Sequence, residues 1–213
     1  GIKLAELSRK ERERLRRKED IIRAAKKLFA EKGYKNTSMN AIAKKADFSK
    51  RTLYQYFENK SDLYFSVALQ IYEDLVKHLE NTELTKKNGL GKIKEVIFAY
   101  YDFYNNNEEY FKIIYDIGKV RQESNNPKLK KYFEIYKNFT DDLKGLIIEG
   151  QNDGSISEEL DPELTTQSLI FILTGIFNQL TITGDNFTNH IGITKDMFSK
   201  HVLNLIHTTL KND

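Results

Sequence analysis

Residues 49–60, SKRTLYQYFENK, carry many hydrogen-bond donors on very little apolar surface. Leu53 and Phe57 are the only wholly apolar residues, and their spacing of four places them on one face of a helix. The outward positions offer cations, hydroxyls, an amide and phenols: Lys50, Arg51, Thr52, Tyr54, Gln55 and Tyr56. Cations and amides can pair with base edges, while hydroxyls and helix N-termini can bind phosphate. A helix this poor in apolar surface needs neighbouring elements to hold it.

Two helices are expected before this stretch. The first begins at Ser8, whose hydroxyl forms a capping box with Glu11, and it ends at Gly33. A second helix opens at Thr37 or Ser38, both of which are good N-cap residues. The second half of the first helix carries an apolar stripe at helical spacing, formed by Ile21, Ala25, Leu28 and Phe29.

The second helix, a three-residue turn and a third helix capped by Ser49 form a helix-turn-helix pattern. Small and apolar residues stand where the helices of such a unit must touch: Ile42, Ala43, Ala46, Phe48 and Leu53. In this motif the later helix enters the major groove of DNA, with its first residues at the base edges. The alternative is an ordinary three-helix packing unit with polar outer faces.

Charge is divided unevenly along the chain, although the net charge is only +3. Residues 1–60 hold 18 Lys and Arg against 8 Asp and Glu, a balance of +10, and residues 61–213 hold 16 against 23, a balance of −7. This asymmetry predicts an anionic partner for the first part only, since phosphate neutralisation needs such a cluster of cations. A solvated basic surface is the alternative. The charged residues 9–20 fit an arm on DNA or a solvated helix laced by Glu–Arg pairs equally well.

The rest of the chain reads as helical almost throughout, so the sequence predicts an all-α protein of about nine helices. After the third helix, these are expected over about 62–84, 93–104, 110–122, 127–150, 162–183 and 194–210. The absence of Cys, of a signal pattern and of a membrane-spanning apolar run favours a cytoplasmic protein without membrane contact. No catalytic, cofactor or metal-ligand motif is present, so neither an enzyme nor a metal or cofactor site is expected.

Residues 21–64 resemble the N-terminal domain of the TetR (tetracycline repressor) family of bacterial transcription regulators. Three segments carry the resemblance: AAKKLFAEKGY, TSMNAIAKKA and SKRTLYQYFENKSDLY. It implies a homodimeric, all-helical repressor that binds a double-stranded DNA operator and is released by a small effector. The implied domains are a DNA-binding helix-turn-helix domain over residues 1–60 and a ligand-binding and dimerisation domain over residues 61–213.

The resemblance places DNA contacts on Thr37, Ser38, Lys50, Arg51, Thr52, Tyr54, Gln55, Tyr56 and Lys60. Lys60 is expected just before the next helix, where its ammonium and the free N–H groups of that helix could meet one phosphate. One departure is Asp47, where the family usually has Gly in the turn. Asp tolerates the left-handed conformation better than most residues, so the turn is expected to survive.

Aromatic residues gather in the middle of the chain, where most must form the core. Buried tyrosines need hydrogen-bond partners, so some of them could line an apolar pocket and offer their hydroxyls to a ligand. For each residue, a place in the core or in a subunit interface is the alternative. The candidate pocket residues are Phe98, Tyr101, Tyr104, Phe111, Tyr115, Tyr132, Phe139, Phe171 and Asn178. Their composition favours an apolar effector, such as a fatty-acyl compound or a hydrophobic drug.

The last two expected helices would pair with their copies in a homodimer, as the resemblance implies. The apolar residues that suggest this are Leu169, Ile170, Leu173, Phe177, Leu180, Val202, Leu205, Ile206 and Leu210. Gly175 would let helices approach closely. Two alternative functions also fit the sequence. One is a basic helix-bundle adaptor that binds membrane or protein, and the other is an enzyme on a helix-turn-helix-like fold.

Overall fold

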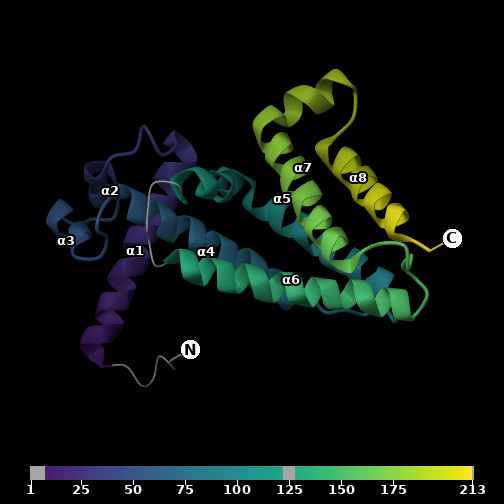
Figure 1. Ribbon diagram of the computed structural model, residues 1–213. Coiled ribbons are helices and arrows are strands. Elements are labelled where there is room, and N and C mark those ends of the chain that lie inside the picture. The colour runs from purple at the N-terminus through teal and green to yellow at the C-terminus, as the bar shows by residue number, and fades with distance from the viewer. Residues whose placement is uncertain (1–7, 122–127, 213) are drawn as a thin grey trace. The chain divides into compact units, whose positions relative to one another are not determined.

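The computed structural model describes residues 8–121 and 128–212, and over this range it contains eight helices and no strand (Figure 1). They are α1 (Arg9–Lys32), α2 (Met39–Lys45), α3 (Lys50–Tyr54), α4 (Lys60–Glu80), α5 (Gly89–Arg121), α6 (Lys128–Asn152), α7 (Pro162–His190) and α8 (Lys195–Leu210). The all-α prediction is confirmed. Within the described range no helix is both long and apolar enough to cross a membrane.

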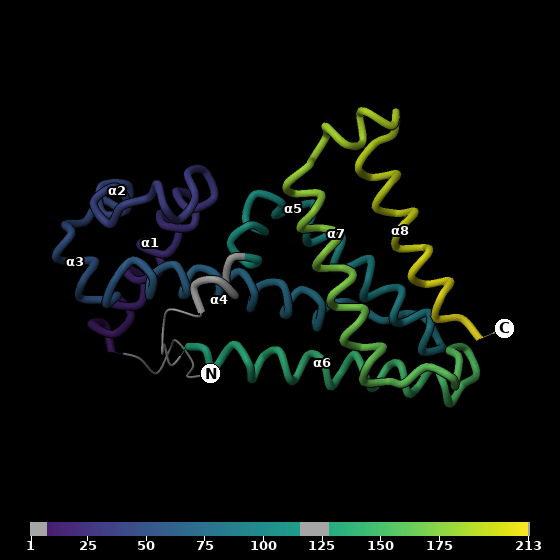
Figure 2. The backbone as a smooth tube through the Cα atoms, turned by 45° about the horizontal axis from the view of Figure 1, so that its top comes forward, coloured from purple at the N-terminus to yellow at the C-terminus, as the bar shows by residue number. Residues whose placement is uncertain are grey.

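The helices divide into two compact units. The first comprises the described parts of residues 1–71 and 113–129, and the second the described parts of residues 72–112 and 130–213. The division falls inside α4 and α5 and near the start of α6, so these helices contribute to both units. Figure 2 follows the backbone through the helices of each unit.

Local sequence signals set the helix starts of the first unit. Ser8 caps α1 in a complete capping box with Glu11, and Gly33 ends that helix at a φ of 75°. Ser38 caps α2 and Ser49 caps α3, each by accepting a backbone N–H bond three residues ahead. The apolar stripe of α1 is buried, and α2 packs against both α1 and α3.

The second unit contains a long helical hairpin of α7 and α8, which contact one another (Figure 1). Asp161 caps α7 with Pro162 in its first turn, and Thr194 caps α8, as the sequence predicts. At the far end of α8, Lys211 forms an isolated antiparallel bridge with Ile156.

Two helices differ from the expected pattern because they contain internal breaks. α5 joins the two helices expected over 93–104 and 110–122, with non-helical backbone at Asn107. α7 continues past the expected end at Thr183, through non-helical backbone at Gly184, and the loop expected there is helical as far as His190. Thr188 is 1% exposed and the ring of Phe187 contacts that of Phe198, so packing on α8 holds this turn.

Candidate nucleic-acid interface

α3 is a five-residue helix held by its cap and two anchors. The Ser49 hydroxyl accepts the Thr52 N–H at 3.1 Å. Leu53 is fully buried and Phe57, just beyond the helix, is 2% exposed, which confirms the predicted anchoring role of both. Because the anchors occupy one side, the other side of α3 remains at the surface of the first unit.

The DNA-contact residues predicted on α3 and the turn after it divide into exposed and half-buried side chains. Lys50, Arg51, Tyr54 and Gln55 are exposed, and the Lys50 ammonium lies 5.9 Å from the centroid of the Tyr54 ring. Thr52 is half-buried, with its hydroxyl 2.9 Å from that of Ser49. The exposed group therefore combines two cations, an amide and a phenol on one short segment.

The helix is shorter than the sequence suggested. α3 ends at Tyr54, so Gln55 forms its C-cap and the half-buried Tyr56 lies in the following turn. The Gln55 N–H bonds to the Thr52 carbonyl at 3.1 Å and that of Tyr56 to the Leu53 carbonyl at 3.0 Å. These bonds fix both backbones in the turn although neither residue belongs to the helix.

Thr37 requires a correction, because its side chain points into the protein. It is 2% exposed, and its hydroxyl lies 3.2 Å from the Leu28 carbonyl oxygen and 2.8 Å from that of Gly33. The hydroxyl thus ties the start of α2 to the end of α1 and does not face a partner. Ser38, the neighbouring candidate, uses its hydroxyl to cap α2 by accepting the Ala41 N–H at 3.1 Å.

Lys60 begins α4, one or two residues earlier than expected, and most of its ammonium is already engaged. Its Nζ donates to the Tyr34 carbonyl at 2.8 Å and to the Thr37 carbonyl at 3.0 Å. The same atom lies 4.2 Å from the centroid of the Tyr34 ring. Since an ammonium has three N–H donors, only one is left for a phosphate. The predicted phosphate contact therefore stays a prediction.

The turn between α2 and α3 forms as the sequence predicts. Asp47 adopts a left-handed backbone conformation, with φ at 58°, and it is the only non-glycine residue with a positive φ over the described range. The Phe48 N–H then reaches the Ala43 carbonyl at 3.0 Å. Asp47 thus takes the conformation that Gly would supply at this position.

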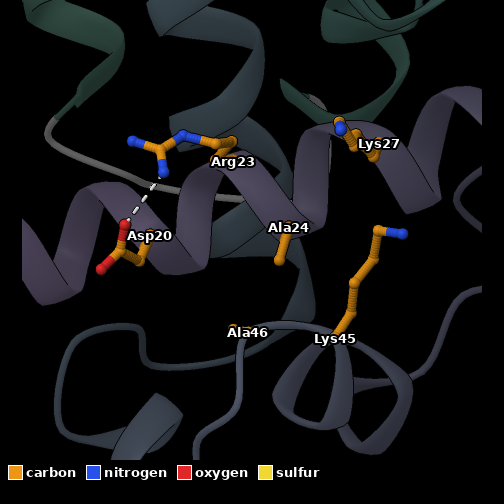
Figure 3. Close-up of a pocket in the computed structure, with 6 residues that line it drawn as sticks. All are labelled: Asp20, Arg23, Ala24, Lys27, Lys45 and Ala46. Carbon is orange, nitrogen blue, oxygen red and sulfur yellow. Dashed lines mark hydrogen bonds and ion pairs between the residues drawn. The ribbon is translucent and has the colours of Figure 1, made fainter.

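A basic groove of about 350 Å³ lies between α1 and the end of α2 (Figure 3). Arg23 is paired with Asp20 at 3.1 Å, so Lys27 and Lys45 supply the unbalanced positive charge among the lining residues. Ala24 and Ala46 complete the lining. Sequence spacing does not reveal this groove, because only the packing of α2 on α1 brings Lys45 opposite Lys27.

The candidate effector residues of the second unit are partly packed into its core. Tyr101, Tyr104 and Phe111 are 6%, 2% and 0% exposed, and Tyr104 lies with its ring centroid 4.5 Å from that of Phe177 and 5.0 Å from that of Phe111. The Tyr101 hydroxyl donates to Asp196 at 2.8 Å. Burial raises the pKa of Tyr104 to about 12, which keeps its hydroxyl neutral. These rings contact one another as core residues do.

The remaining candidates are placed differently. Phe98, Tyr132, Phe139 and Asn178 are half-buried in the second unit, and the half-buried Tyr115 belongs to the first. Phe171 requires a correction, because it is 74% exposed on α7 and does not line an interior pocket of its unit. Tyr72, which is not among the residues predicted from the sequence, contacts the Tyr132 ring at 4.7 Å between centroids.

Comparison with known proteins identifies the family. Residues 21–67 match the model for bacterial regulatory proteins of the tetR family. The chain is 30% identical to the fatty acid metabolism regulator protein of Bacillus subtilis over 149 residues, which cover 70% of this chain and 75% of that protein. The chain belongs to the TetR family. As a TetR-family member it is a DNA-binding regulator of transcription and not an enzyme, which confirms the resemblance seen in its sequence.

Two further comparisons cover different shares of the chain. The HTH-type transcriptional activator FasR of Mycolicibacterium smegmatis is 27% identical over 106 residues, covering 50% of this chain and 48% of that protein. The crystal structure of FadR from Bacillus subtilis in complex with stearoyl-CoA has a TM-score of 0.68 at 24% identity, covering 90% of this chain and 98% of that one. The structural likeness shows that the chain has the fold of that protein.

Proposed function

We propose that this TetR-family protein is a repressor that binds a palindromic operator as a homodimer and is released by a small apolar effector. In this proposal residues 1–60 form the DNA-binding domain and residues 61–213 the ligand-binding and dimerisation domain. The observation that carries the proposal is the exposed face of α3, where Lys50, Arg51, Tyr54 and Gln55 surround a helix anchored by buried Leu53.

The exposed side chains of this segment suit a division of labour on DNA. Arg and Lys can donate to guanine O6 and N7, and Gln can pair with adenine N6 and N7, so Arg51, Lys50 and Gln55 are proposed to read bases. Tyr54 and Tyr56 are proposed to bind phosphates through their hydroxyls, with Ser38 and the remaining N–H of Lys60. Thr52 is proposed to contact a base from the same helix. Its hydroxyl already shares a hydrogen bond with that of Ser49, so it has less capacity left for DNA.

Selection from a random-sequence duplex library tests this assignment. The unchanged protein should enrich one palindromic sequence, and Arg51→Ala or Gln55→Ala should alter the base preference at single positions of each half-site. A specific bidentate contact contributes about 1–3 kcal/mol of discrimination, so the loss is about 5- to 150-fold at that base. Tyr54→Ala should instead weaken binding to all sequences alike. If the unchanged protein enriches no sequence, the operator-binding proposal is wrong.

The proposed homodimer is supported by an apolar face that the protomer leaves exposed on α7 and α8. Phe171 is 74% exposed and Met197 60%, against the small fraction expected of large apolar side chains inside a core. Gly175 lies on this face with no atom within 4 Å of where a Cβ would stand, so a helix of a second copy could approach closely. The exposed apolar residues of the two helices are Leu164, Phe171, Ile172, Ile182, Phe187, Met197 and Leu205.

This face differs from the residues first suggested for the dimer. Leu169, Leu173, Phe177 and Leu180 of α7 are buried within the protomer. On α8, Ile206 and Leu210 are buried in the same way, and only Leu205 of that set is more than half exposed. The stripe chosen from the sequence is thus the inner face of the α7–α8 hairpin, and the outer face is the candidate interface.

The names of two similar proteins support a fatty-acyl effector. One relative is a fatty acid metabolism regulator, and one solved structure of the same fold holds stearoyl-CoA. We propose that the effector is a long-chain acyl compound of the acyl-CoA type. Adding stearoyl-CoA should then release the selected operator from the protein, while CoA alone, the matched control without the acyl chain, should not. Release by neither compound would contradict the acyl assignment and leave operator binding intact.

One relative is named as an activator, so the direction of regulation needs its own test. A reporter gene placed behind the selected operator should be less active when the protein is present and recover in cells fed long-chain fatty acid. Higher reporter activity in the presence of the protein would contradict the repressor assignment.

A further inference from the structure

The first turns of α1 form a cationic extension that the proposed function does not use. Residues 9–18, here called the α1 extension, contain seven Lys and Arg and two Glu. Every residue from Arg9 to Arg17 is exposed, and the first buried residue of the helix is Ile21. Figure 1 shows these turns running out beyond α2 and α3. At about 1.5 Å per residue, the extension is about 15 Å long.

The two carboxylates of the extension are already engaged within the helix. The Glu11 carboxylate accepts the Ser8 N–H at 2.8 Å, and that of Glu13 accepts the Arg17 Nε–H at 3.0 Å. Hydrogen bonds to Ser8 and Arg17 lower the pKa of Glu11 and Glu13 respectively, so both stay ionised at neutral pH. The capping box also fixes the start of the helix. The extension is therefore an ordered helix with a large excess of positive charge.

The cations fall on two sides of the helix. Lys10, Arg14 and Arg17, here called the inner row, continue at helical spacing the row that Ile21 and Leu28 bury further along. The core-facing row of α1 thus becomes cationic where the helix leaves the core. Arg9, Arg12 and Arg16, here called the outer row, lie on the opposite side of the helix.

A contact of Lys18 shows what lies on the inner side. Its ammonium is 6.0 Å from the centroid of the Phe57 ring, and Phe57 anchors the turn that follows α3. Because Lys18 adjoins the inner row on the helix surface, that row projects on the same side as the α3–α4 turn. A surface bound by α3 would thus extend beneath the inner row.

We propose that the inner row binds the sugar–phosphate backbone of the duplex that α3 reads, beside the bases that α3 contacts. This inference rests on the proposed DNA binding and adds a sequence-independent contact to it. Lys10 and Arg17 are seven residues apart, or about 10 Å along the helix, which spans about three phosphates of one strand at ~3.4 Å of axis per phosphate. Because Arg17 is already paired with Glu13 at 3.0 Å, two phosphate contacts are expected from the row.

Salt dependence of binding tests the proposal with two matched variants of the full chain. The inner-row variant carries Lys10→Gln, Arg14→Gln and Arg17→Gln, and the outer-row variant carries Arg9→Gln, Arg12→Gln and Arg16→Gln. Both lose three positive charges from the same helix segment, and Gln retains helix propensity. The probe is a fluorescently labelled random-sequence duplex of about 30 base pairs, and anisotropy gives Kd between about 50 and 200 mM KCl.

The inner-row variant should show a slope of log affinity against log salt that is smaller by about 2, since each phosphate contact contributes about 0.9. Its loss of affinity over that salt range should be about 10-fold smaller than that of the unchanged protein. The outer-row variant should keep the original slope. A charge-preserving variant, Arg14→Lys with Arg17→Lys, should also keep it.

Each contrary outcome points to a different failure. Equal slopes of log affinity against log salt for the inner-row and outer-row variants would overturn the inference. A reduced slope in the charge-preserving variant would overturn it as well. Binding to phosphatidylserine vesicles that disappears only in the inner-row variant, with DNA binding unchanged, would assign the row to a membrane instead. Absence of salt-dependent DNA binding in the unchanged protein would overturn the proposed function itself. Circular dichroism of each variant checks that the helix is retained.

Discussion

Asp47 holds the turn between α2 and α3 in a left-handed conformation that L-residues adopt at a cost. Its φ is 58°, and its side chain is exposed, so no packing offsets the strain. Such a conformation costs most residues about 1–2 kcal/mol, and less for Asp, whose side chain can hydrogen-bond locally. The turn that orients α3 is therefore formed at some expense of stability.

Replacing Asp47 with Gly or with Ala should change the free energy of unfolding in opposite directions. Asp47→Gly removes the steric strain and should raise the free energy of unfolding by about 0.5 kcal/mol, after the larger unfolded-state entropy of Gly is subtracted. Asp47→Ala should lower it by about 1 kcal/mol, because Ala lacks the local hydrogen bonding of Asp. Urea denaturation measures both, and a stabilising Asp47→Ala would contradict the explanation.

Two of the predicted DNA-contact residues make long-range hydrogen bonds that sequence spacing cannot reveal. The exposed positions of α3 follow from the buried pair Leu53 and Phe57, which local spacing reveals. Thr37 looks equally available, yet its hydroxyl bonds to Leu28, nine residues earlier in the chain. Lys60 bonds to carbonyls 26 and 23 residues away. Only the tertiary packing of the first unit brings these donors to their acceptors.

Among the helices, starts were predictable and ends were less so. Ser8, Ser38, Ser49, Asp161 and Thr194 cap helices as their side-chain chemistry predicts, because a cap depends on residues only three positions away. α7 instead continues beyond Gly184, where φ is 49° and ψ is −141°. Contacts with α8 hold the turn after this break, and no local signal announces them.

The break in α7 predicts a contrast between two Gly→Ala substitutions. Neither Gly184 nor Gly145, in α6, has an atom within 4 Å of where a Cβ would stand, so neither change creates a clash. Gly184→Ala should lower the free energy of unfolding by about 1–3 kcal/mol, because its backbone conformation suits only Gly. Gly145→Ala should raise it by about 0.5–1 kcal/mol, as for other helix interiors. Denaturant titration of each variant measures the contrast.

α8 should contribute to the pH dependence of stability through His207. Burial, followed by the nearby charges of Lys94 and Lys211, lowers the pKa of His207. The unfolded chain therefore binds a proton more readily, and stability should fall as pH drops below about 6.5 toward the lower pKa of the folded state. His207→Gln should flatten this part of the pH profile relative to the unchanged protein. An identical profile would show that His207 does not contribute.

The exposed apolar face of α7 and α8 bears on how two copies of the chain could pair on DNA. A duplex palindrome presents two half-sites about one helical turn apart, and one protomer carries a single α3. In the proposed dimer, the outer face supplies the apolar surface that a stable pairing needs. The sequence alone does not separate it from the inner face. Both faces of α7 are apolar, so only tertiary packing, in which the Phe177 ring lies against Tyr104 of α5 and α8 contacts α7, shows which face is covered.

Phe171→Glu should convert the proposed dimer into a monomer by placing a charge in its interface. The matched control is Phe133→Glu on α6, because Phe133 is also partly exposed, at 46%, but does not belong to this face. Light scattering after size exclusion should give the monomer mass for the first variant only, together with weaker operator binding. A monomeric mass for the unchanged protein would refute the dimer.

The bonds made by Lys60 also give the protein a chemical signature. An amine that donates two hydrogen bonds to carbonyls and lies over the Tyr34 ring has its nitrogen poorly presented to an acylating reagent. Lys50, only ten residues earlier, is exposed. Acetic anhydride at limiting dose should therefore modify Lys50 well before Lys60. Added duplex should protect Lys50 and leave the low reactivity of Lys60 nearly as it was, so the two amines report DNA contact and domain integrity separately.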